Sequence, residues 1–239
     1  MRVIANEWKQ KITPRLQRRL VLVTLGFWLP MFFFLQLADE VYDKKPILLD
    51  TQIIMALHRA ASSPLTSFMK FITHGGDVIF ILIFTILLVG FLFMQKRRSD
   101  ASAVLASVGG AAFINVVLKI FFQRTRPSLF VAFVNEKSFS FPSGHAMGSS
   151  ALAFSLVIMS WRTKYRWLAV SLAVAYVLLI GISRVYLGVH YPSDIIAGWC
   201  VSAIWVVLGK SVSDSSRERM EKISWSSSTM STFFMWLSV

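Results

Sequence analysis

Residues 101–127 read ASAVLASVGGAAFINVVLKIFFQRTRP. Up to position 122 this stretch is strongly apolar and contains no proline, and a helix of roughly 20 such residues crosses the hydrocarbon core of a bilayer. Lys119 stands near the end of the apolar part, and Arg124, Arg126 and Pro127 follow it directly. The stretch therefore predicts a transmembrane helix that carries positive charge to one face of the membrane.

Five further apolar segments share the chain with this one. Together they predict six membrane helices, at residues 20–38, 78–94, 101–122, 143–161, 167–183 and 193–210. The composition agrees, because 55% of the residues are hydrophobic and only 15% are charged, whereas about 25% are charged in ordinary soluble domains. We therefore expect an all-α integral membrane protein. Residues 1–239 would form a single membrane-embedded domain, with a motif-bearing core at 101–210 and a cytoplasmic tail at 211–239.

The N-terminal part of the chain allows two alternatives. Residues 20–38 follow a basic start and could be a signal peptide, but their apolar stretch exceeds the ~7–15 residues of a signal-peptide core, so a retained helix is favoured. Residues 39–77 are the longest predicted outward stretch. From 53 to 72 apolar and polar residues alternate at roughly helical spacing, interrupted by Pro64. This pattern predicts two short amphipathic helices on the membrane surface, with a plain connecting loop as the alternative.

The net charge of +13 has two explanations. A basic chain can bind nucleic acid, but here the cations flank apolar runs and form no single basic face, so no nucleic-acid partner is expected. Cytoplasmic loops of membrane proteins collect Lys and Arg. If the six helices alternate in direction, most of the cations fall on one side: Arg2, Lys9, Lys11, Arg15, Arg18, Arg19, Lys96, Arg97, Arg98, Arg162, Lys164, Arg166, Lys210, Arg217, Arg219 and Lys222. Both termini are therefore predicted to be cytoplasmic.

Three clusters of polar residues fall at the outward ends of the predicted helices. Ionisable groups in membrane segments are costly and usually serve a function. The first cluster holds Lys119 and Arg126, with Arg124 between them and Pro127 after them. A lysine supplies a mobile point charge and an arginine a planar fork of donors, which together suit a phosphate group, although cations can also snorkel to an interface. We expect Pro127 to end the helix.

The second cluster is Pro142-Ser143-Gly144-His145. Proline followed by serine predicts a helix start, where unpaired backbone N–H groups and the helix dipole attract an anion. Gly144 permits a close backbone approach, and the Ser143 hydroxyl can donate to an oxyanion. His145 lies in the first turn of the same helix, so we favour a catalytic role for it over a structural one.

The third cluster comprises Ser183, Arg184, His190 and Asp194. His190 and Asp194 are four positions apart, so they share a face if the last helix begins near Pro192. An aspartate that accepts from one ring nitrogen fixes the tautomer, leaves the other nitrogen as a nucleophile and stabilises the charged ring. Asp194 could instead serve only as a cap at the helix start.

The three clusters together predict phosphoryl transfer through a covalent phosphohistidine. They supply three cations, a helix-end anion site, two histidines and one orienting carboxylate on one membrane face. His190 would attack phosphorus while Asp194 orients it, and His145 would protonate the leaving group as a general acid. The predicted phosphate-binding residues are Lys119, Arg126, Ser143, Gly144 and Arg184.

The patterns Lys-x6-Arg-Pro at 119–127, Pro-Ser-Gly-His at 142–145 and Ser-Arg-x5-His-x3-Asp at 183–194 resemble the motifs of the type 2 phosphatidic acid phosphatase superfamily. The resemblance implies a metal-independent phosphatase that needs no cofactor and acts on lipid phosphates in the bilayer. Bacterial relatives dephosphorylate undecaprenyl pyrophosphate, phosphatidylglycerophosphate, phosphatidic acid or lipid A. It therefore also implies the bacterial cytoplasmic (inner) membrane. The charge distribution places the active site on the side facing the periplasm or the cell exterior.

The sequence agrees with the absence of a metal or cofactor that this resemblance implies. It has no paired carboxylates typical of a magnesium site, no His-Glu-x-x-His pattern and no cysteine cluster. The single cysteine, Cys200, lies in an apolar run and is interpreted as a small core residue.

Two functions other than lipid phosphatase can be compared with the sequence. A vanadate-dependent haloperoxidase of the same superfamily would be a large soluble protein, unlike this small apolar chain. A non-catalytic lipid-phosphate binding or transport protein would need only the cations and the helix-end site, whereas His145, His190 and Asp194 are all present. The preferred lipid and the oligomeric state are left open. The small residues Gly109-Gly110-Ala111-Ala112 favour close helix packing within one chain over dimerisation.

Overall fold

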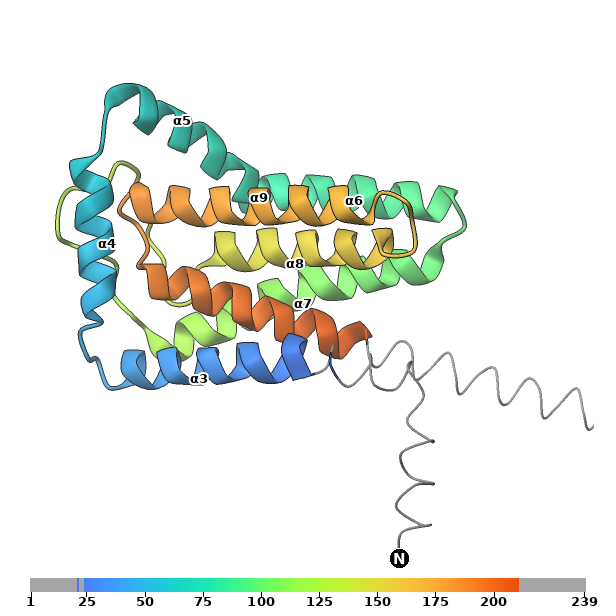
Figure 1. Cartoon of the computed structure of the whole chain (residues 1–239), viewed down its shortest axis with the longest axis horizontal. Coiled ribbons are helices and arrows are strands. Elements are labelled where there is room, and N and C mark those ends of the chain that lie inside the picture. Colours follow the sequence, from blue (N-terminus) through green and yellow to red (C-terminus); the bar gives the residue numbers. More distant parts are fainter. Residues whose placement is uncertain (1–20, 22–23, 211–239) are drawn as a thin grey trace, which may run out of the picture.

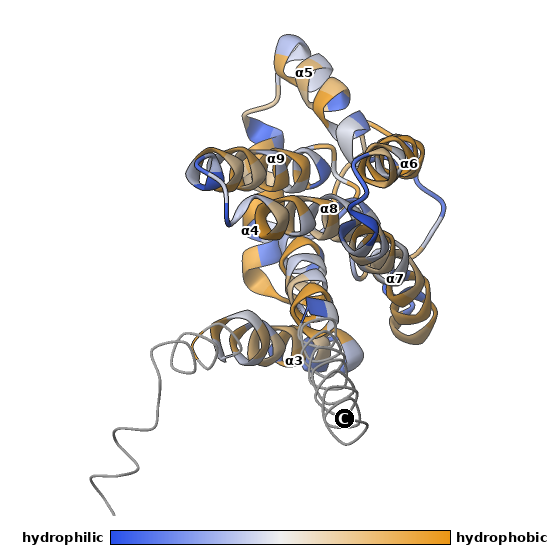
Figure 2. Ribbon diagram, turned by 90° about the vertical axis from the view of Figure 1, so that its right-hand side faces the viewer, coloured by the Kyte–Doolittle hydropathy of each residue, from blue (hydrophilic) through white to orange (hydrophobic). Residues whose placement is uncertain are grey.

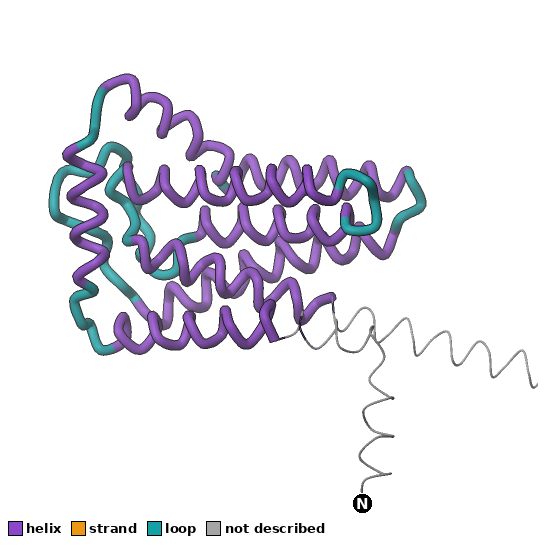
Figure 3. Tube along the Cα trace, in the orientation of Figure 1, coloured by secondary structure: helices purple, strands orange, loops and turns teal. Residues whose placement is uncertain are grey.

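The structure, a computed structural model, describes residue 21 and residues 24–210. Every regular element in this described part is a helix (Figure 3). The basic residues from Arg2 to Arg19, positions 20, 22 and 23 of the predicted helix 20–38 and the predicted tail 211–239 lie outside the described residues.

All six predicted apolar segments form helices wherever they are described. The elements are, in chain order, the π-helical turn η1 (Thr24–Trp28), α3 (Leu29–Tyr42), α4 (Leu48–Arg59), α5 (Ser63–Thr73), the 3-10 turn η2 (His74–Gly76), α6 (Val78–Met94), α7 (Arg98–Phe122), α8 (Gly144–Ser160), α9 (Arg166–Tyr186) and the helix Pro192–Lys210, which has no label in Figure 1. The first segment continues as a helix past its predicted end at residue 38.

Length and composition qualify three helices of the described part as membrane spans, namely α7, α9 and Pro192–Lys210. A fourth span results if α5 and η2 are joined to α6 across a bend of 47°. The helix α8 is apolar but has only 17 residues, which is the lower limit of about 17 residues for a span. The all-helical class is therefore confirmed, whereas six crossings remain a prediction.

The long helices run side by side, and α4 lies across one end of the bundle (Figure 1). The loop 123–143, which connects α7 to α8, reaches the same end. The central position belongs to α8, which packs against α9, α7 and α6. One face of α8 is built from small residues, among them Ala146, Ser149, Ser150 and Ala153, all of which are buried, and small side chains let neighbouring helices approach closely.

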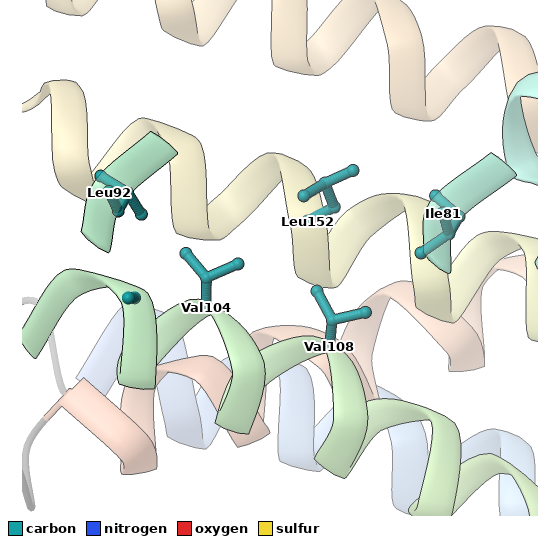
Figure 4. Packing of buried hydrophobic residues seen from close by; sticks show 6 residues of the cluster. Ile81, Leu92, Val104, Val108 and Leu152 are labelled. Carbon is teal, nitrogen blue, oxygen red and sulfur yellow. The ribbon is translucent and has the colours of Figure 1, made fainter. Parts of the chain in front are cut away.

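The apolar core continues between the helices in layers. One cluster joins α6, α7 and α8 through Ile81, Leu92, Val104, Val108 and Leu152 (Figure 4). Branched side chains from three helices interdigitate there, as in the core of a soluble protein.

A second contact brings α7 against the last helix. A Cβ atom at Gly110 would lie 2.3 Å from the indole ring of Trp205, and the Trp205 indole N–H donates to the carbonyl oxygen of Ala106 at 2.9 Å. Ala111, the next small residue, is fully buried in the cluster shared by α7, α8 and the last helix. The prediction of close packing within one chain is therefore confirmed for Gly110 and Ala111.

The outer surface of the bundle is apolar. Large hydrophobic side chains are exposed along α6, including Val78, Ile79, Leu82 and Leu87, and the ribbons of α6 and α7 are mostly hydrophobic (Figure 2). A soluble protein rarely exposes such a continuous apolar surface, and the α-helix satisfies its own backbone polar groups in lipid. The surface therefore matches a lipid environment.

The stretch 39–77 forms the two short helices α4 and α5, so the alternative of a plain connecting loop is wrong. Pro64 stands in the first turn of α5, where proline is tolerated because the N–H groups there have no partner within the helix. The break between the two helices thus falls just before the proline. Their position on the membrane surface remains a prediction.

Candidate active site

The three predicted clusters meet at the end of the bundle covered by α4. Lys119 lies in the last turn of α7, and Ser143 is the N-cap of α8. His190 lies between α9 and the last helix, and Asp194 lies in the first turn of that helix. The backbone N–H of Ser143 donates to the carbonyl oxygen of Asp194 at 3.1 Å. This bond joins the second cluster directly to the third.

The chain reaches His190 through a Schellman turn that ends α9. The N–H of Gly188 donates to the carbonyl of Val185 at 3.0 Å, and the N–H of Val189 donates to that of Arg184 at 3.3 Å. Gly188 has φ = 77°, a left-handed conformation that glycine adopts without steric cost. A Cβ at this position would also lie 2.7 Å from the Phe130 ring. Glycine is therefore required here, and the turn it makes sets the position of the following histidine.

The hydrogen bonds of His190 define its tautomer. Its Nδ1 lies 3.3 Å from Asp194 Oδ2, and its Nε2 lies 3.3 Å from Arg126 Nη1. An ionised carboxylate can only accept and a guanidinium can only donate, so Nδ1 carries the hydrogen and Nε2 presents its lone pair. The nucleophilic nitrogen is thus Nε2, and it lies beside a predicted phosphate-binding cation.

The ring of His190 is uncharged at neutral pH. Burial, only partly opposed by the hydrogen bond to Asp194, lowers the pKa of His190 to about 3, against an ordinary value near 6.5. Only the unprotonated imidazole has a lone pair with which to attack phosphorus. The pKa shift therefore keeps the residue in its nucleophilic form.

Asp194 is completely buried and its oxygens have further partners. Oδ2 accepts from the hydroxyl of Ser140 and from the backbone N–H of Tyr191 at 2.9 Å, and Oδ1 accepts from Arg124 Nη1 at 2.5 Å. The bond to Tyr191 N–H is the backward half of a capping box. Asp194 therefore caps its helix and orients His190 at the same time, so the two interpretations of this residue are compatible.

A second buried aspartate, Asp50 on α4, belongs to the same network. It accepts from Arg124 Nη2 at 2.9 Å, from the backbone N–H of Ser193 at 2.9 Å and from the Ser193 hydroxyl at 2.5 Å. The guanidinium of Arg124 thus bridges Asp50 and Asp194, and it also lies 4.0 Å above the ring of Tyr191. These bonds fasten the helix that covers the site to the start of the last helix.

Residues of the loop 123–143 accept hydrogen bonds from the two cations of the first cluster. Lys119 Nζ donates to the Ser138 hydroxyl at 2.9 Å and to the carbonyl of Phe139 at 2.7 Å. Arg126 donates from Nε to the Ser138 carbonyl at 2.7 Å and from Nη1 to the Val189 carbonyl at 2.7 Å. Both cations are thus fixed against the same serine, and Arg126 also contacts His190 Nε2.

The expected helix end at Pro127 is wrong. The helix α7 ends at Phe122, and its cap, Gln123, has a left-handed backbone conformation with φ = 46°. A residue in this conformation stops a helix by bonding back to it, and the Gln123 N–H donates to the Lys119 carbonyl at 3.0 Å. Arg126 therefore reaches the site from a loop and not from a helix end.

Arg184 is almost fully buried and faces a carboxylate. It donates from Nη1 to the Thr73 hydroxyl at 2.9 Å and from Nη2 to Glu136, which also lies 3.7 Å from Arg126 Nη2. Partial burial opposes ionisation of Glu136, but the charge of Arg184 outweighs it and lowers the pKa of that carboxyl. Glu136 is thus an anion that bridges two predicted phosphate-binding arginines.

The start of α8 has the predicted form. Ser143 caps the helix by accepting from the Ala146 N–H at 3.4 Å. A Cβ at Gly144 would lie 3.1 Å from Asn115 Oδ1, and Asn115 Nδ2 donates to the Pro142 carbonyl at 3.0 Å. The close approach at Gly144 is therefore made to α7, which holds the helix start in place.

His145 has a carboxylate partner of its own. Its Nε2 donates to Asp77 Oδ1 at 2.8 Å, and Asp77 Oδ2 accepts from His74 Nδ1 at 2.7 Å. His74 is exposed and contacts the site through Asp77. The other histidine of that stretch, His58, stacks on Phe130 at 3.7 Å between ring centroids.

The structure brings all eight predicted site residues to one end of the bundle, whereas their roles remain predictions. Sequence reasoning missed three carboxylates, Asp50, Asp77 and Glu136, and gave Arg124 no role. Glu136 and Asp194 are the two acidic residues between positions 101 and 194, which is a signal that could have pointed to Glu136. Asp50 and Asp77 lie outside every motif and carry no such signal.

Comparison with known proteins identifies the family. Residues 100–217 match the sequence model of the PAP2 superfamily. Phosphatidylglycerophosphatase B of Bacillus subtilis is 31% identical over 195 residues, which are 80% of this chain and 96% of that protein. The chain belongs to the PAP2 superfamily. This membership confirms the resemblance seen in the three motifs.

Two further relatives agree with this assignment. The undecaprenyl-diphosphatase of Sulfolobus acidocaldarius is 28% identical over 189 residues, which are 75% of this chain and 87% of that protein. The crystal structure of a transmembrane PAP2-type phosphatidylglycerolphosphate phosphatase from Bacillus subtilis superimposes with a TM-score of 0.67 at 30% identity, and the match covers 78% of this chain and 94% of that one. The chain is therefore a multi-pass membrane phosphatase of the PAP2 superfamily.

Proposed function

We propose that the chain hydrolyses a lipid phosphate or lipid diphosphate through a phosphohistidine at His190. The observation that carries this proposal is the buried, neutral His190, with Nδ1 held by Asp194 and Nε2 next to Arg126. A ring that served only to bind an anion would gain from being positively charged. Here the protein keeps it uncharged and orients its lone pair, which is the requirement of a nucleophile.

The reaction proceeds in two displacements. In the first, the lone pair of His190 Nε2 forms a bond to phosphorus while the bond from phosphorus to the leaving oxygen breaks. The leaving oxygen keeps that electron pair and takes a proton from His145. In the second, a water oxygen attacks phosphorus and gives a proton to His145, and the N–P bond breaks with its electrons returning to His190. Asp194 stabilises the positive ring of the intermediate.

The cations neutralise the charge that spreads over the phosphoryl oxygens during transfer. Arg184 Nε is buried and has no hydrogen-bond partner among the described residues, and a buried donor without a partner is costly. A bound phosphoryl group would satisfy this donor and would take the place of Glu136 between Arg184 and Arg126. Lys119, Ser143 and the Gly144 N–H would hold the remaining oxygens.

The substrate proposed is a lipid of the bacterial membrane, such as phosphatidylglycerophosphate, undecaprenyl pyrophosphate or phosphatidic acid. Relatives that cover most of this chain are named for the first two of these lipids. The apolar outer surface of the bundle adjoins the site, so a lipid can remain in the bilayer while its phosphate reaches His190. The positive charge of the three cations replaces the charge that metal ions supply in other phosphatases.

The purified protein in detergent is expected to release phosphate from at least one of these lipids in the presence of EDTA. The panel comprises phosphatidylglycerophosphate, phosphatidic acid, a polyprenyl diphosphate and lipid A, and the measured quantity is phosphate released per unit time. Binding of these lipids without any release would instead support a binding or transport protein. Release that EDTA abolishes and added metal restores would contradict the metal-independent mechanism.

The proposed topology has six crossings, both termini in the cytoplasm and the site on the outer side of the bacterial inner membrane. The loops between α6 and α7 and between α8 and α9 carry the basic residues Lys96, Arg97, Arg162 and Lys164, and such residues collect on the cytoplasmic side. The site lies at the opposite end of the bundle from these loops.

This topology predicts opposite labelling of two introduced cysteines. In a Cys200→Ala background, Phe139→Cys should react with a membrane-impermeant thiol reagent in intact cells, because Phe139 is exposed in the loop of the site. Lys164→Cys, which is exposed at the other end, should react only after lysis. The reverse pattern would overturn the orientation, and equal labelling in intact cells would overturn the assignment of two sides.

A further inference from the structure

The site contains a second aspartate–histidine pair that lies outside the three motifs. Asp77 Oδ1 accepts from His145 Nε2 at 2.8 Å. Asp77 directly precedes α6. It lies outside residues 100–217, which match the superfamily. Its partner His145 is the proposed general acid, so the contact bears on the chemistry of the leaving group.

The segment that carries Asp77 is fixed against α9. The hydroxyl of Tyr176 donates to the Gly75 carbonyl at 2.6 Å, and the N–H of Asp77 donates to the His74 carbonyl at 3.1 Å. A Cβ at Gly76 would lie 2.8 Å from Ile180 Cγ2 and 3.0 Å from His145 Cδ2. The glycine thus lets the turn η2 pack directly against the imidazole, which restricts the ring and places the carboxylate within bonding distance.

The pairing determines which nitrogen of His145 can act. Because the carboxylate only accepts, Nε2 carries a hydrogen and points at Asp77. The Cδ2 atom, which adjoins Nε2, packs against Gly76, so the opposite edge of the ring carries Nδ1. The relation of Asp77 to His145 is therefore the same as that of Asp194 to His190, with the two nitrogens exchanged.

We propose that Asp77 is a positioning residue for the general acid His145, so that Nδ1 delivers the proton to the leaving oxygen. The carboxylate holds the ring in one orientation and stabilises the imidazolium that must donate. The proton leaves Nδ1 as the P–O bond breaks, and His145 remains neutral with Nε2–H still bonded to Asp77. This inference rests on the proposed function, since it assigns a part in that reaction.

The proposal predicts an effect that depends on the leaving group. An alkoxide is a strong base and requires a proton as it departs, whereas a nitrophenolate is a weak base and departs without one. Loss of a residue that acts only through the general acid should therefore slow the first kind of substrate and spare the second. A structural defect in the site would slow both.

The test compares Asp77→Asn with the wild type on two phosphate monoesters of equal chain length, an alkyl phosphate and an alkylated nitrophenyl phosphate. We expect kcat/KM, which reports the step in which the leaving group departs, to fall about 10- to 100-fold on the alkyl ester. This loss is smaller than the roughly 10²–10⁴-fold that a whole general acid contributes, because His145 itself remains. On the nitrophenyl ester it should change by less than about 3-fold. The Asp77 side chain makes no cap hydrogen bond to α6, so the substitution leaves the start of that helix unchanged.

Two controls make the result specific. Asp100→Asn removes an equivalent carboxylate, which pairs with Arg97 at 2.8 Å at the other end of the bundle, and should leave both substrates unaffected. On phosphatidic acid, the loss in Asp77→Asn combined with His145→Ala should equal that of His145→Ala alone, because Asp77 acts only through that ring.

Three outcomes would each overturn the proposal. Asp77→Asn could lower kcat/KM equally on both esters, it could lower kcat/KM on neither, or its loss could add to that of His145→Ala. These outcomes leave the phosphohistidine mechanism intact. That mechanism fails if His190→Ala retains turnover, so the two proposals are tested separately.

Discussion

His190→Ala is expected to lower kcat on the preferred lipid phosphate on the order of 10⁴-fold or more, because loss of a covalent nucleophile removes the reaction path itself. The imidazole contributes the attacking Nε2, and its contact with Arg126 is long, at 3.3 Å. Arg126 is also held by the carbonyls of Ser138 and Val189, so it stays in place when the ring is removed. Binding of the lipid should therefore be retained. The measurements are phosphate release and equilibrium binding of the same lipid to the purified variant.

The covalent intermediate gives an independent check. Substrate carrying radiolabelled phosphate, mixed with wild-type protein and quenched in alkali, should leave label on the protein that is stable to base and released by acid, as expected for a phosphoramidate bond. The label should be absent from His190→Ala and present in His58→Gln, a variant of a histidine outside the site. Unchanged turnover in His190→Ala would refute the nucleophile assignment. If that variant loses lipid binding as well, His190→Asn takes its place.

Asp194→Asn is expected to lower kcat/KM on the order of 10³-fold or more, since loss of the orienting carboxylate in a comparable histidine pair costs about 10⁴-fold. An asparagine can present its amide N–H₂ to His190 Nδ1, which reverses the tautomer and places the hydrogen on Nε2. The lone pair then no longer faces phosphorus. The measurement is the ratio of kcat/KM between the variant and the wild type on one lipid substrate.

Asp50→Asn is the matched control for this prediction. Asp50 and Asp194 are both buried and both accept from Arg124, so the two substitutions remove comparable charge from the same guanidinium. The Tm in detergent should therefore fall in both variants. The activity of Asp50→Asn should remain within about 10-fold of the wild type, because Asp50 has no hydrogen bond to His190 among the described residues. Similar losses of activity in both variants would mean that Asp194 acts through the stability of the network and not through the ring.

The sequence alone was sufficient for the helices and for most of the site. Apolar length marked each helix, because the backbone of a membrane segment must bond to itself and needs an apolar surface toward lipid. The pairs His190 with Asp194 and Ser143 with the start of α8 were predictable, because both depend on local spacing and on the rules for helix starts. Polar residues in an apolar chain are few, which made the three clusters stand out.

Contacts between distant parts of the chain were decided only by the tertiary structure. Asp50 meets Arg124 across 74 positions and Asp77 meets His145 across 68, and neither aspartate differs in the sequence from an ordinary polar residue of a loop or surface helix. Asp50 is buried, and a buried charge must find a partner. The half-exposed Asp77 pairs with His145 because the packing of η2 against α8 brings the two side chains together. Local spacing encodes how a helix begins and ends, whereas the partner of a buried charge depends on which helices the packing of small and large side chains brings together.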